Sequence, residues 1–190
     1  MTYQNAMRID DPGVNGVAVD RIMSTIESIE DDVENAKFQF RLNNHWVEGG
    51  LNRSRIKEFF AVGREDDTRT EAFVVDADQP YANAGEDSAP NPMEWVLHSL
   101  ASCLTTTMVY HAAVQGVEID SVESWLEGDL DVRGILGLSD DVRKAYNKVR
   151  VRMQVKSAAS VEELKALALY SPVYDLVSKS LPTEFIVEKI

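Results

Sequence analysis

The sequence predicts an α+β protein built around one buried helix. The predicted strands come in groups separated by helices, without the regular strand–helix alternation of a parallel sheet. One stretch, Trp95 to Val114, contains no Asp, Glu, Lys or Arg, which is typical of a helix covered on most of its sides. Hydrophobic residues make up 44% of the 190 residues and charged residues 27%, so we expect one domain with a core of its own.

The chain is expected to begin with a polar start and an amphipathic helix. Between Val17 and Asn35, apolar residues recur every three or four positions, with charged residues opposite them. We therefore treat residues 1–36 as an N-terminal extension and residues 37–190 as the main domain.

The main domain is expected to open with strands. Lys37 to Leu42 alternates between apolar and polar residues, as a half-buried strand does. Gly49-Gly50 marks a turn. Strands are expected again at 55–62 and 71–76, followed by a loop rich in Asp, Gly and Pro at 77–90.

The uncharged stretch is expected to form a helix with a strong start signal. Asn91 suits the N-cap, Pro92 suits the first helical position, and Glu94 completes a capping box three residues after the cap. The stretch is long enough to cross a bilayer, but it contains two histidines and several hydroxyl residues, and both flanks are acidic. We therefore expect a helix in a protein core or subunit interface and no membrane span.

The C-terminal half is expected to contain further strands and a second helix. The clearest alternation places four apolar side chains on one side of a strand, namely Val149, Val151, Met153 and Val155. The expected elements are, in order, a strand at 122–132, a loop with a short helix at 134–145, a strand at 146–156, a helix from Ser160 to Ser171, a helical turn at 173–178 and a strand at 184–190.

Composition argues against several classes of function. A net charge of −13 and a pI of about 4.6 repel phosphate backbones and anionic headgroups, so neither a nucleic-acid nor a membrane partner is expected. One cysteine cannot form an intramolecular disulfide and no signal peptide is visible, so we expect a cytoplasmic protein. His45, His98 and His111 are too scattered for a metal site, and no metal or cofactor is expected.

Cys103 is the main candidate for a reactive group. The sequence has no glycine-rich phosphate loop, no GxSxG, no HExxH and no CxxC. On an ideal helix, the residues nearest the Cys103 side are hydroxyl-bearing or apolar. A reactive thiolate would need an Arg, Lys or His from another segment or subunit. From the residues alone, the thiol is either such a nucleophile or an inert core residue.

An ordered set of motifs resembles the OsmC/Ohr family of thiol peroxidases. Asn91-Pro92-Met93-Glu94 leads through a Leu/Ala-rich run to Cys103, eleven residues after the proline. Trp46 before Gly49-Gly50, Ser171-Pro172-Val173 and a closing Leu181-Pro182 also fit the family. The chain is most similar to the longer members that carry an added N-terminal helix.

The resemblance implies a fold and an assembly. Antiparallel sheets of two intertwined chains wrap around two central helices, and the cysteine site lies near the subunit interface of this homodimer. It also implies an activity, the thiol-dependent reduction of hydroperoxides in oxidative-stress defence.

The resemblance assigns a role to Cys103 and leaves the position of the family's second cysteine unfilled. The peroxidatic cysteine corresponds to Cys103. The resolving cysteine of the family corresponds to Ser171, which cannot form a disulfide, so a one-cysteine mechanism with an external thiol reductant is implied.

Two activating residues of the family are displaced along this chain. The glutamate that follows Asn-Pro corresponds to Met93, with Glu94 one place later. The activating arginine corresponds to Leu51, with Arg53 and Arg55 close enough for a shifted hairpin to supply one. The candidate catalytic residues are therefore Cys103, Arg53, Arg55 and Glu94.

Two hypotheses from different classes remain. In the first, the chain is a one-cysteine peroxidase, in which the Cys103 thiolate attacks a hydroperoxide. In the second, it is a non-catalytic protein of the same fold that binds a small apolar ligand, and Cys103 is a buried core residue. A guanidinium near the sulfur favours the first, because a nearby cation lowers the pKa of a thiol.

Overall fold

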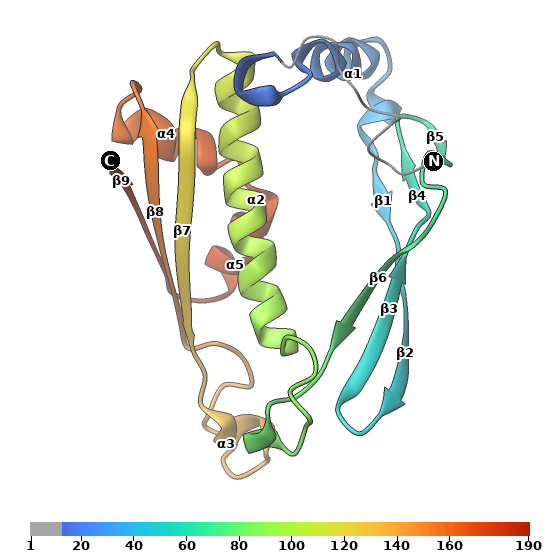
Figure 1. The fold of residues 1–190 in the computed structure, drawn as a ribbon, viewed down its shortest axis with the longest axis vertical. Coiled ribbons are helices and arrows are strands. Elements are labelled where there is room, and N and C mark those ends of the chain that lie inside the picture. The colour runs from blue at the N-terminus through green and yellow to red at the C-terminus, as the bar shows by residue number, and fades with distance from the viewer. Residues whose placement is uncertain (1–12) are drawn as a thin grey trace. The chain divides into compact units, whose positions relative to one another are not determined.

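The computed structural model describes residues 13–190, which form two compact units (Figure 1). The C-terminal unit comprises residues 97–190 with the described residues before Asp20, and the N-terminal unit comprises residues 20–96. Each unit has its own sheets. The division expected between residues 36 and 37 is a different one and stays a prediction.

The C-terminal unit combines a long helix with a three-stranded sheet in the order β7-β8-β9. Figure 1 shows α2 running alongside this sheet. The elements are α2 (Pro92–Val114), which enters this unit at Leu97, β7 (Ile119–Asp129), α3 (Val132–Ile135), β8 (Lys148–Ser157), α4 (Val161–Ala168), α5 (Pro172–Ser180) and β9 (Thr183–Lys189).

The core of this unit is formed by one side of α2 and one face of the sheet. On α2 the fully buried residues recur every fourth position, at Leu100, Leu104, Met108 and Ala112. On β8 the predicted alternation is confirmed by the buried side chains of Val149, Val151, Met153 and Val155. The expected long central helix is therefore confirmed, and only part of its circumference is buried.

The strand β9 corrects the expectation of wholly antiparallel sheets. β7 pairs antiparallel with β8, but β9 runs parallel to β8, with Val151 opposite Phe185. The reason lies in the connection, since α4 and α5 carry the chain back along the sheet before β9 begins, and parallel neighbours require such a crossover. Lys165 of α4 donates a hydrogen bond to the Phe185 carbonyl at 2.9 Å and ties the crossover to the strand.

The helix expected from Ser160 begins as predicted but ends before residue 171. The Ser160 hydroxyl accepts a hydrogen bond from the Glu163 backbone N–H at 3.1 Å, as expected for an N-cap. The helix ends at Ala168, and the expected turn at 173–178 is a longer helix, α5.

The connection between β7 and β8 folds back on itself. The strand expected to reach residue 132 ends at Asp129, because Asp131 caps α3 by accepting from the Arg133 backbone N–H. Gly134 is buried, and a Cβ atom there would lie 2.7 Å from the Val142 carbonyl oxygen. This close approach explains a glycine at that position.

The N-terminal unit contains one helix and two small antiparallel sheets, ordered β1-β4-β5 and β2-β3-β6. The amphipathic helix expected at 17–35 is observed as α1 (Val19–Asp31), which Asp32 separates from a short 3-10 turn, η3 (Val33–Ala36). The strands are β1 (Gln39–Phe40), β2 (Asn43–Glu48), β3 (Leu51–Ile56), β4 (Phe59–Ala61), β5 (Arg64–Asp66) and β6 (Phe73–Ala77).

Two expected strands of this unit are wrong in their extent. The strand at 37–42 is divided, because the chain leaves its partner β4 after Phe40 and pairs with β3 from Asn43 onward. The strand at 55–62 is likewise two strands, β3 and β4, which belong to different sheets. The alternation at 37–42 continues past the first change of partner to Leu42, and the stretch 55–62 contains no Gly or Pro to mark the second, so the sequence pattern does not reveal them. The Gly49-Gly50 turn is confirmed between β2 and β3.

The N-terminal stretch before α1 is fixed to the C-terminal unit by Asn15. Its side-chain amide donates to the Val117 carbonyl at 2.9 Å and accepts from the Ile119 backbone N–H at 2.8 Å. The amide thereby pairs with the beginning of β7 as a neighbouring strand would. Val17, two residues later, is buried.

A stability prediction follows from the turn between β4 and β5. Ala61 pairs with Arg64, so Val62 and Gly63 form a two-residue turn, and both have positive φ, +48° and +72°. A β-branched residue is disfavoured there, whereas Asn-Gly suits this turn. We expect Val62→Asn to stabilise the fold by about 1 kcal/mol in chemical denaturation. Val62→Ala is the control and should gain little, because alanine also avoids positive φ; equal gains would contradict the strain.

Candidate functional site

The start of α2 is fixed by a complete capping box. The Asn91 side chain accepts from the Met93 backbone N–H at 2.8 Å, and the Glu94 carboxylate accepts from the Asn91 backbone N–H at 2.7 Å. The Asn91 amide also donates to Gln79 at 2.7 Å. The candidate Glu94 thus has a structural task at the helix start.

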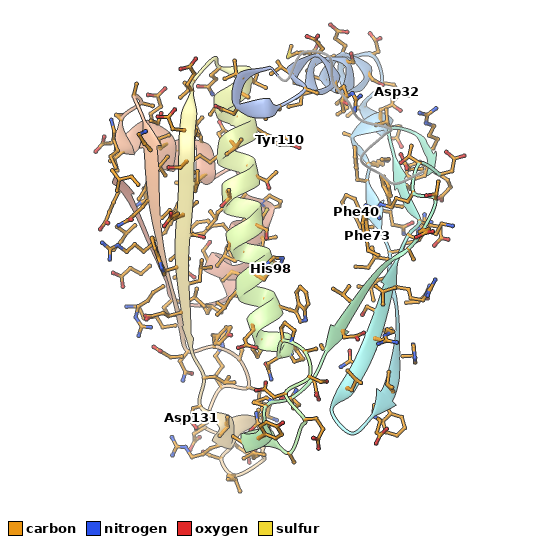
Figure 2. The ribbon with its side chains drawn as sticks, in the orientation of Figure 1. Asp32, Phe40, Phe73, His98, Tyr110 and Asp131 are labelled. Atoms are coloured by element: carbon orange, nitrogen blue, oxygen red, sulfur yellow. The ribbon has the colours of Figure 1, made fainter. Side chains whose placement is uncertain are left out.

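Cys103 lies at the edge of the buried side of α2. Its thiol is half-buried, one residue before the fully buried Leu104. The sulfur contacts the Thr107 hydroxyl one turn later, with 4.0 Å between Sγ and Oγ1. Tyr110, labelled in Figure 2, is exposed on the same helix. The setting is half-buried and hydroxyl-bearing, as the helix geometry predicts.

Ser171 fills the second-cysteine position with a structural hydroxyl. It is fully buried and caps α5, accepting a hydrogen bond from the Tyr174 backbone N–H at 3.1 Å. Pro172 follows at the first helical position. A serine oxygen suits this cap, and it cannot take part in sulfur exchange.

The two candidate arginines of β3 differ in their surroundings. Arg53 lies opposite Asp76 of β6 and donates two hydrogen bonds to its carboxylate, from Nε and from Nη2, each 2.7 Å long. These bonds hold the pKa of the Asp76 carboxyl below its ordinary value and raise the pKa of Arg53. Arg55 is exposed and makes no side-chain hydrogen bond or ion pair with any residue from 13 to 190.

Two aspartates, Asp76 and Asp78, fix the strand and the loop that precede α2, and the sequence did not indicate either of them. The Asp76 backbone carbonyl accepts from the Trp95 indole at 3.0 Å, so this residue links β3, β6 and the first turn of α2. Asp78 is fully buried and accepts from the Gln79 N–H, the Ser88 N–H and the Ser88 hydroxyl. Hydrogen bonds from Ser88 lead in holding the pKa of this carboxyl low. Isolated aspartates in a strand end and a loop form no pattern that signals such roles.

The candidate site residues belong to both units. Arg53, Arg55 and Glu94 lie in the N-terminal unit, and Cys103 lies in the C-terminal unit. That these residues act together in one catalytic site therefore stays a prediction.

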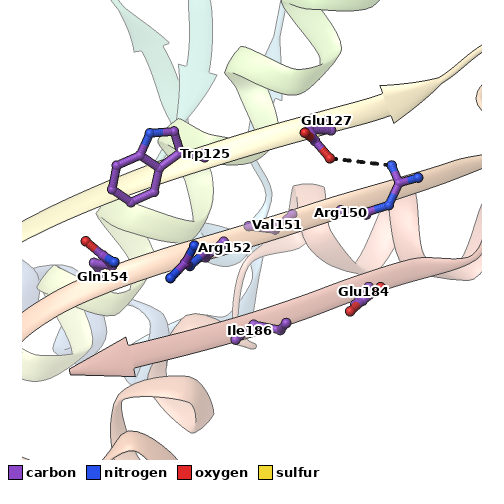
Figure 3. Close-up of a pocket in the computed structure, with 8 residues that line it drawn as sticks. All are labelled: Trp125, Glu127, Arg150, Val151, Arg152, Gln154, Glu184 and Ile186. Carbon is purple, nitrogen blue, oxygen red and sulfur yellow. Dashed lines mark ion pairs between the residues drawn. The ribbon is translucent and has the colours of Figure 1, made fainter.

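The outer face of the C-terminal sheet contains a hollow of about 520 Å³ (Figure 3). Trp125, Arg152 and Ile186 lie side by side in register across its middle. The four basic residues of β8 pair alternately with acids on the two flanking strands, as Lys148–Glu184, Arg150–Asp129, Arg152–Glu188 and Lys156–Asp120. The hollow is thus part of an ion-paired, solvated face.

Neither a metal centre nor a membrane segment emerges in the described part of the chain. Within residues 13–190, no group of three or more His, Cys, Asp or Glu side chains is arranged to hold a metal ion. Over the same range, no helix has the length and apolarity that crossing a membrane requires.

These features define an α+β protein whose one cysteine lies on a capped helix that has no Asp, Glu, Lys or Arg from Trp95 onward. Its sequence between residues 85 and 185 matches the family of OsmC-like proteins over more than half of the chain. The chain therefore belongs to the OsmC-like protein family, as the motifs around Asn91 and Cys103 predict. No curated protein matches it significantly.

Solved structures share the fold at low sequence identity. An OsmC-like protein from Mycoplasma pneumoniae is 13% identical with a TM-score of 0.58, over 80% of this chain and 97% of that chain. An organic hydroperoxide resistance protein OsmC from Legionella pneumophila is 16% identical with a TM-score of 0.51, over 79% and 96%. A putative organic hydroperoxide resistance protein from Vibrio cholerae, with captopril bound in one of its active sites, is 14% identical with a TM-score of 0.52, over 78% and 90%. The α+β OsmC-like fold is confirmed.

The Arg53–Asp76 pair leads to a prediction about acid stability. Because the folded state lowers the pKa of Asp76, the pair stabilises the fold at neutral pH, and this contribution is lost as pH falls below the ordinary aspartate value through the folded one. We expect Asp76→Asn to lower the melting temperature at pH 7, with the difference from wild type shrinking below about pH 4.

Arg53→Gln should show the same convergence, and the double variant should lose no more than either single variant. Additive losses would show that the two side chains stabilise the fold independently.

Proposed function

We propose that the protein is a one-cysteine hydroperoxide reductase of the OsmC/Ohr type that acts in oxidative-stress defence through Cys103. The observation that carries the proposal is the position of this half-buried thiol on the capped family helix, together with Ser171 as a structural cap at the second position. The relatives named for organic hydroperoxide resistance support the substrate class.

The proposed reaction is balanced without a cofactor. The Cys103 thiolate attacks the distal oxygen of a hydroperoxide, the O–O bond breaks, and the leaving alkoxide takes a proton to become an alcohol. Cys103 is left as a sulfenic acid. One external thiol then displaces water to form a mixed disulfide, and a second external thiol releases Cys103 as that disulfide is exchanged.

The cation that activates the thiol is proposed to come from β3. Arg53 and Arg55 are the two candidates, and the surroundings favour Arg55, because Asp76 already neutralises the Arg53 guanidinium. Glu94 would act indirectly, by fixing the start of α2.

A second candidate function is supported by a specific observation. Leu51, Met93 and Ser171 replace three activating or resolving residues of the family, and no ion pair touches Cys103 in the described chain. A non-catalytic protein that binds a small apolar ligand would need none of those groups. Captopril in an active site of the Vibrio cholerae protein supports small-molecule binding by this fold.

The decisive prediction concerns the oxidation product. One equivalent of cumene hydroperoxide should add one oxygen to Cys103, and dimedone should trap the sulfenic acid, because Ser171 cannot convert it to an intrachain disulfide. Intact-protein mass spectrometry measures both products, and excess peroxide should drive the thiol to the sulfinic state.

Cys103→Ser is the control and should abolish both the adduct and peroxide consumption. Absence of oxidation in the wild-type protein after a tenfold excess of organic hydroperoxide would favour the ligand-binding function instead.

We also propose that the chain forms a homodimer in a cytoplasmic setting. In the N-terminal unit only Ala61, Asp78 and Gly85 are buried, while large apolar side chains such as Phe40 and Phe73 are exposed (Figure 2). An exposed apolar surface of this extent is typical of a subunit interface. A second copy would cover it together with the free side of α2.

The homodimer can be tested with two equally exposed aromatic residues. Tyr110 on α2 and Trp125 on the outer sheet face are each 49% exposed. We expect the wild type to sediment as a dimer at micromolar concentration and Tyr110→Asp to weaken the dimer, because a charge on the free side of α2 would be desolvated there. Trp125→Asp should leave the dimer intact. A stable, folded wild-type monomer would refute the assembly.

A further inference from the structure

The hydroxyl of Thr107 contacts the Cys103 sulfur. Its oxygen lies 4.0 Å from Sγ, one helical turn along α2, and both side chains are half-buried. The helix supplies no charged residue between Trp95 and Val114. The titratable side chains of this stretch besides Cys103 are His98, Tyr110 and His111, and the His111 ring stacks on Tyr170. The side chain in contact with the sulfur is the hydroxyl of Thr107.

The neighbouring hydroxyl of Ser102 is differently engaged. It donates to the His98 backbone carbonyl at 2.8 Å and lies 3.4 Å from the His98 ring nitrogen Nε2. Ser102 is thus adjacent to Cys103 in sequence, but its hydroxyl proton is already donated to the His98 carbonyl in the preceding turn of the helix. Thr106 is adjacent to Thr107 and exposed. These two residues provide matched controls on the same helix.

Protonation of the sulfur decides the direction of the Cys103–Thr107 contact. With a neutral thiol, either group can donate to the other. A thiolate has no proton, so only Thr107 can then donate. A hydrogen bond to the charged form favours that form and lowers the pKa of the acid.

We propose that Thr107 is a catalytic residue that donates a hydrogen bond to the Cys103 thiolate and thereby favours the nucleophilic form over the neutral thiol. The role rests on the proposed peroxidase function for its biological meaning, although the contact itself does not. His98 lies about one and a half turns before the sulfur and Tyr110 about two turns after it, so neither occupies the adjacent position on the helix.

The test compares the reactivity of Cys103 in five proteins. The rate of alkylation by iodoacetamide, followed by mass spectrometry from pH 5 to 10, gives the apparent pKa of the thiol. We expect Thr107→Val, which keeps the side-chain shape and removes the donor, to raise that value by about one unit and to slow alkylation at pH 7 several-fold. Thr107→Ser should restore the wild-type profile, and Thr106→Val and Ser102→Ala should match wild type.

Two outcomes would overturn the proposal. The first is a Thr107→Val profile equal to those of Thr106→Val and Ser102→Ala, and the second is an equal loss in Thr107→Ser, which would assign the effect to packing of the methyl group. Should Thr107→Val fail to fold, Thr107→Ala takes its place, with Thr106→Ala as its control.

The test separates this inference from the proposed function. Iodoacetamide reports on the thiolate without any peroxide chemistry, so a shifted profile supports Thr107 even if wild-type Cys103 resists cumene hydroperoxide. In that case only the peroxidase function fails. An unshifted profile with normal peroxide reduction removes Thr107 and leaves the function in place.

Discussion

The C-terminal unit depends on the burial of one side of α2, because this helix has no Asp, Glu, Lys or Arg from Trp95 to Val114 that would favour exposure to water. Leu100, Leu104 and Met108 are fully buried in the unit's core, and the sheet contributes Val151 and Met153 to the same core. Cys103 lies at the boundary of this contact, and its half-buried setting follows from its position next to Leu104. The chemistry available to the sulfur is therefore set by the packing of the helix that carries it.

The start of that helix is controlled separately. Glu94 accepts from the Asn91 backbone N–H, and the Asn91 side chain accepts from the Met93 backbone N–H and donates to Gln79. Buried Asp78 accepts from Ser88 and so holds the loop before the helix. Asp76 links the same helix to β3 through Trp95 and Arg53. A substitution in β3 can thus shift the first turn of α2 through Asp76, although β3 and Trp95 are joined only by way of that residue.

Sequence patterns predicted those parts of the fold that depend on local chemistry. The cap at Asn91, the cap at Ser160 and the alternation of β8 each follow from neighbouring residues. The pairing partners of the strands could not be predicted from the sequence, because a strand alternates in the same way whether it pairs with β3 or with β4. The direction of β9 could not be predicted either, because it depends on the two helices that precede it. For the site, family motifs indicated Cys103 and Ser171. The Arg53–Asp76 pair was missed, since its two members are joined only by sheet register.

The ladder of ion pairs on β8 affects how other molecules approach the protein. Four of the chain's 19 lysines and arginines are neutralised by neighbours within one sheet, while acidic residues number 32 in all. Each of these ion pairs cancels one acid as well as one base, so the net charge of −13 remains and the long-range field is that of an anion. This field extends over a Debye length of about 8 Å at physiological ionic strength. Negatively charged molecules are repelled before they reach the surface, whereas uncharged ones diffuse in unhindered. The net charge of the protein thus selects among encounter partners before any of them contacts the side chains near the sulfur.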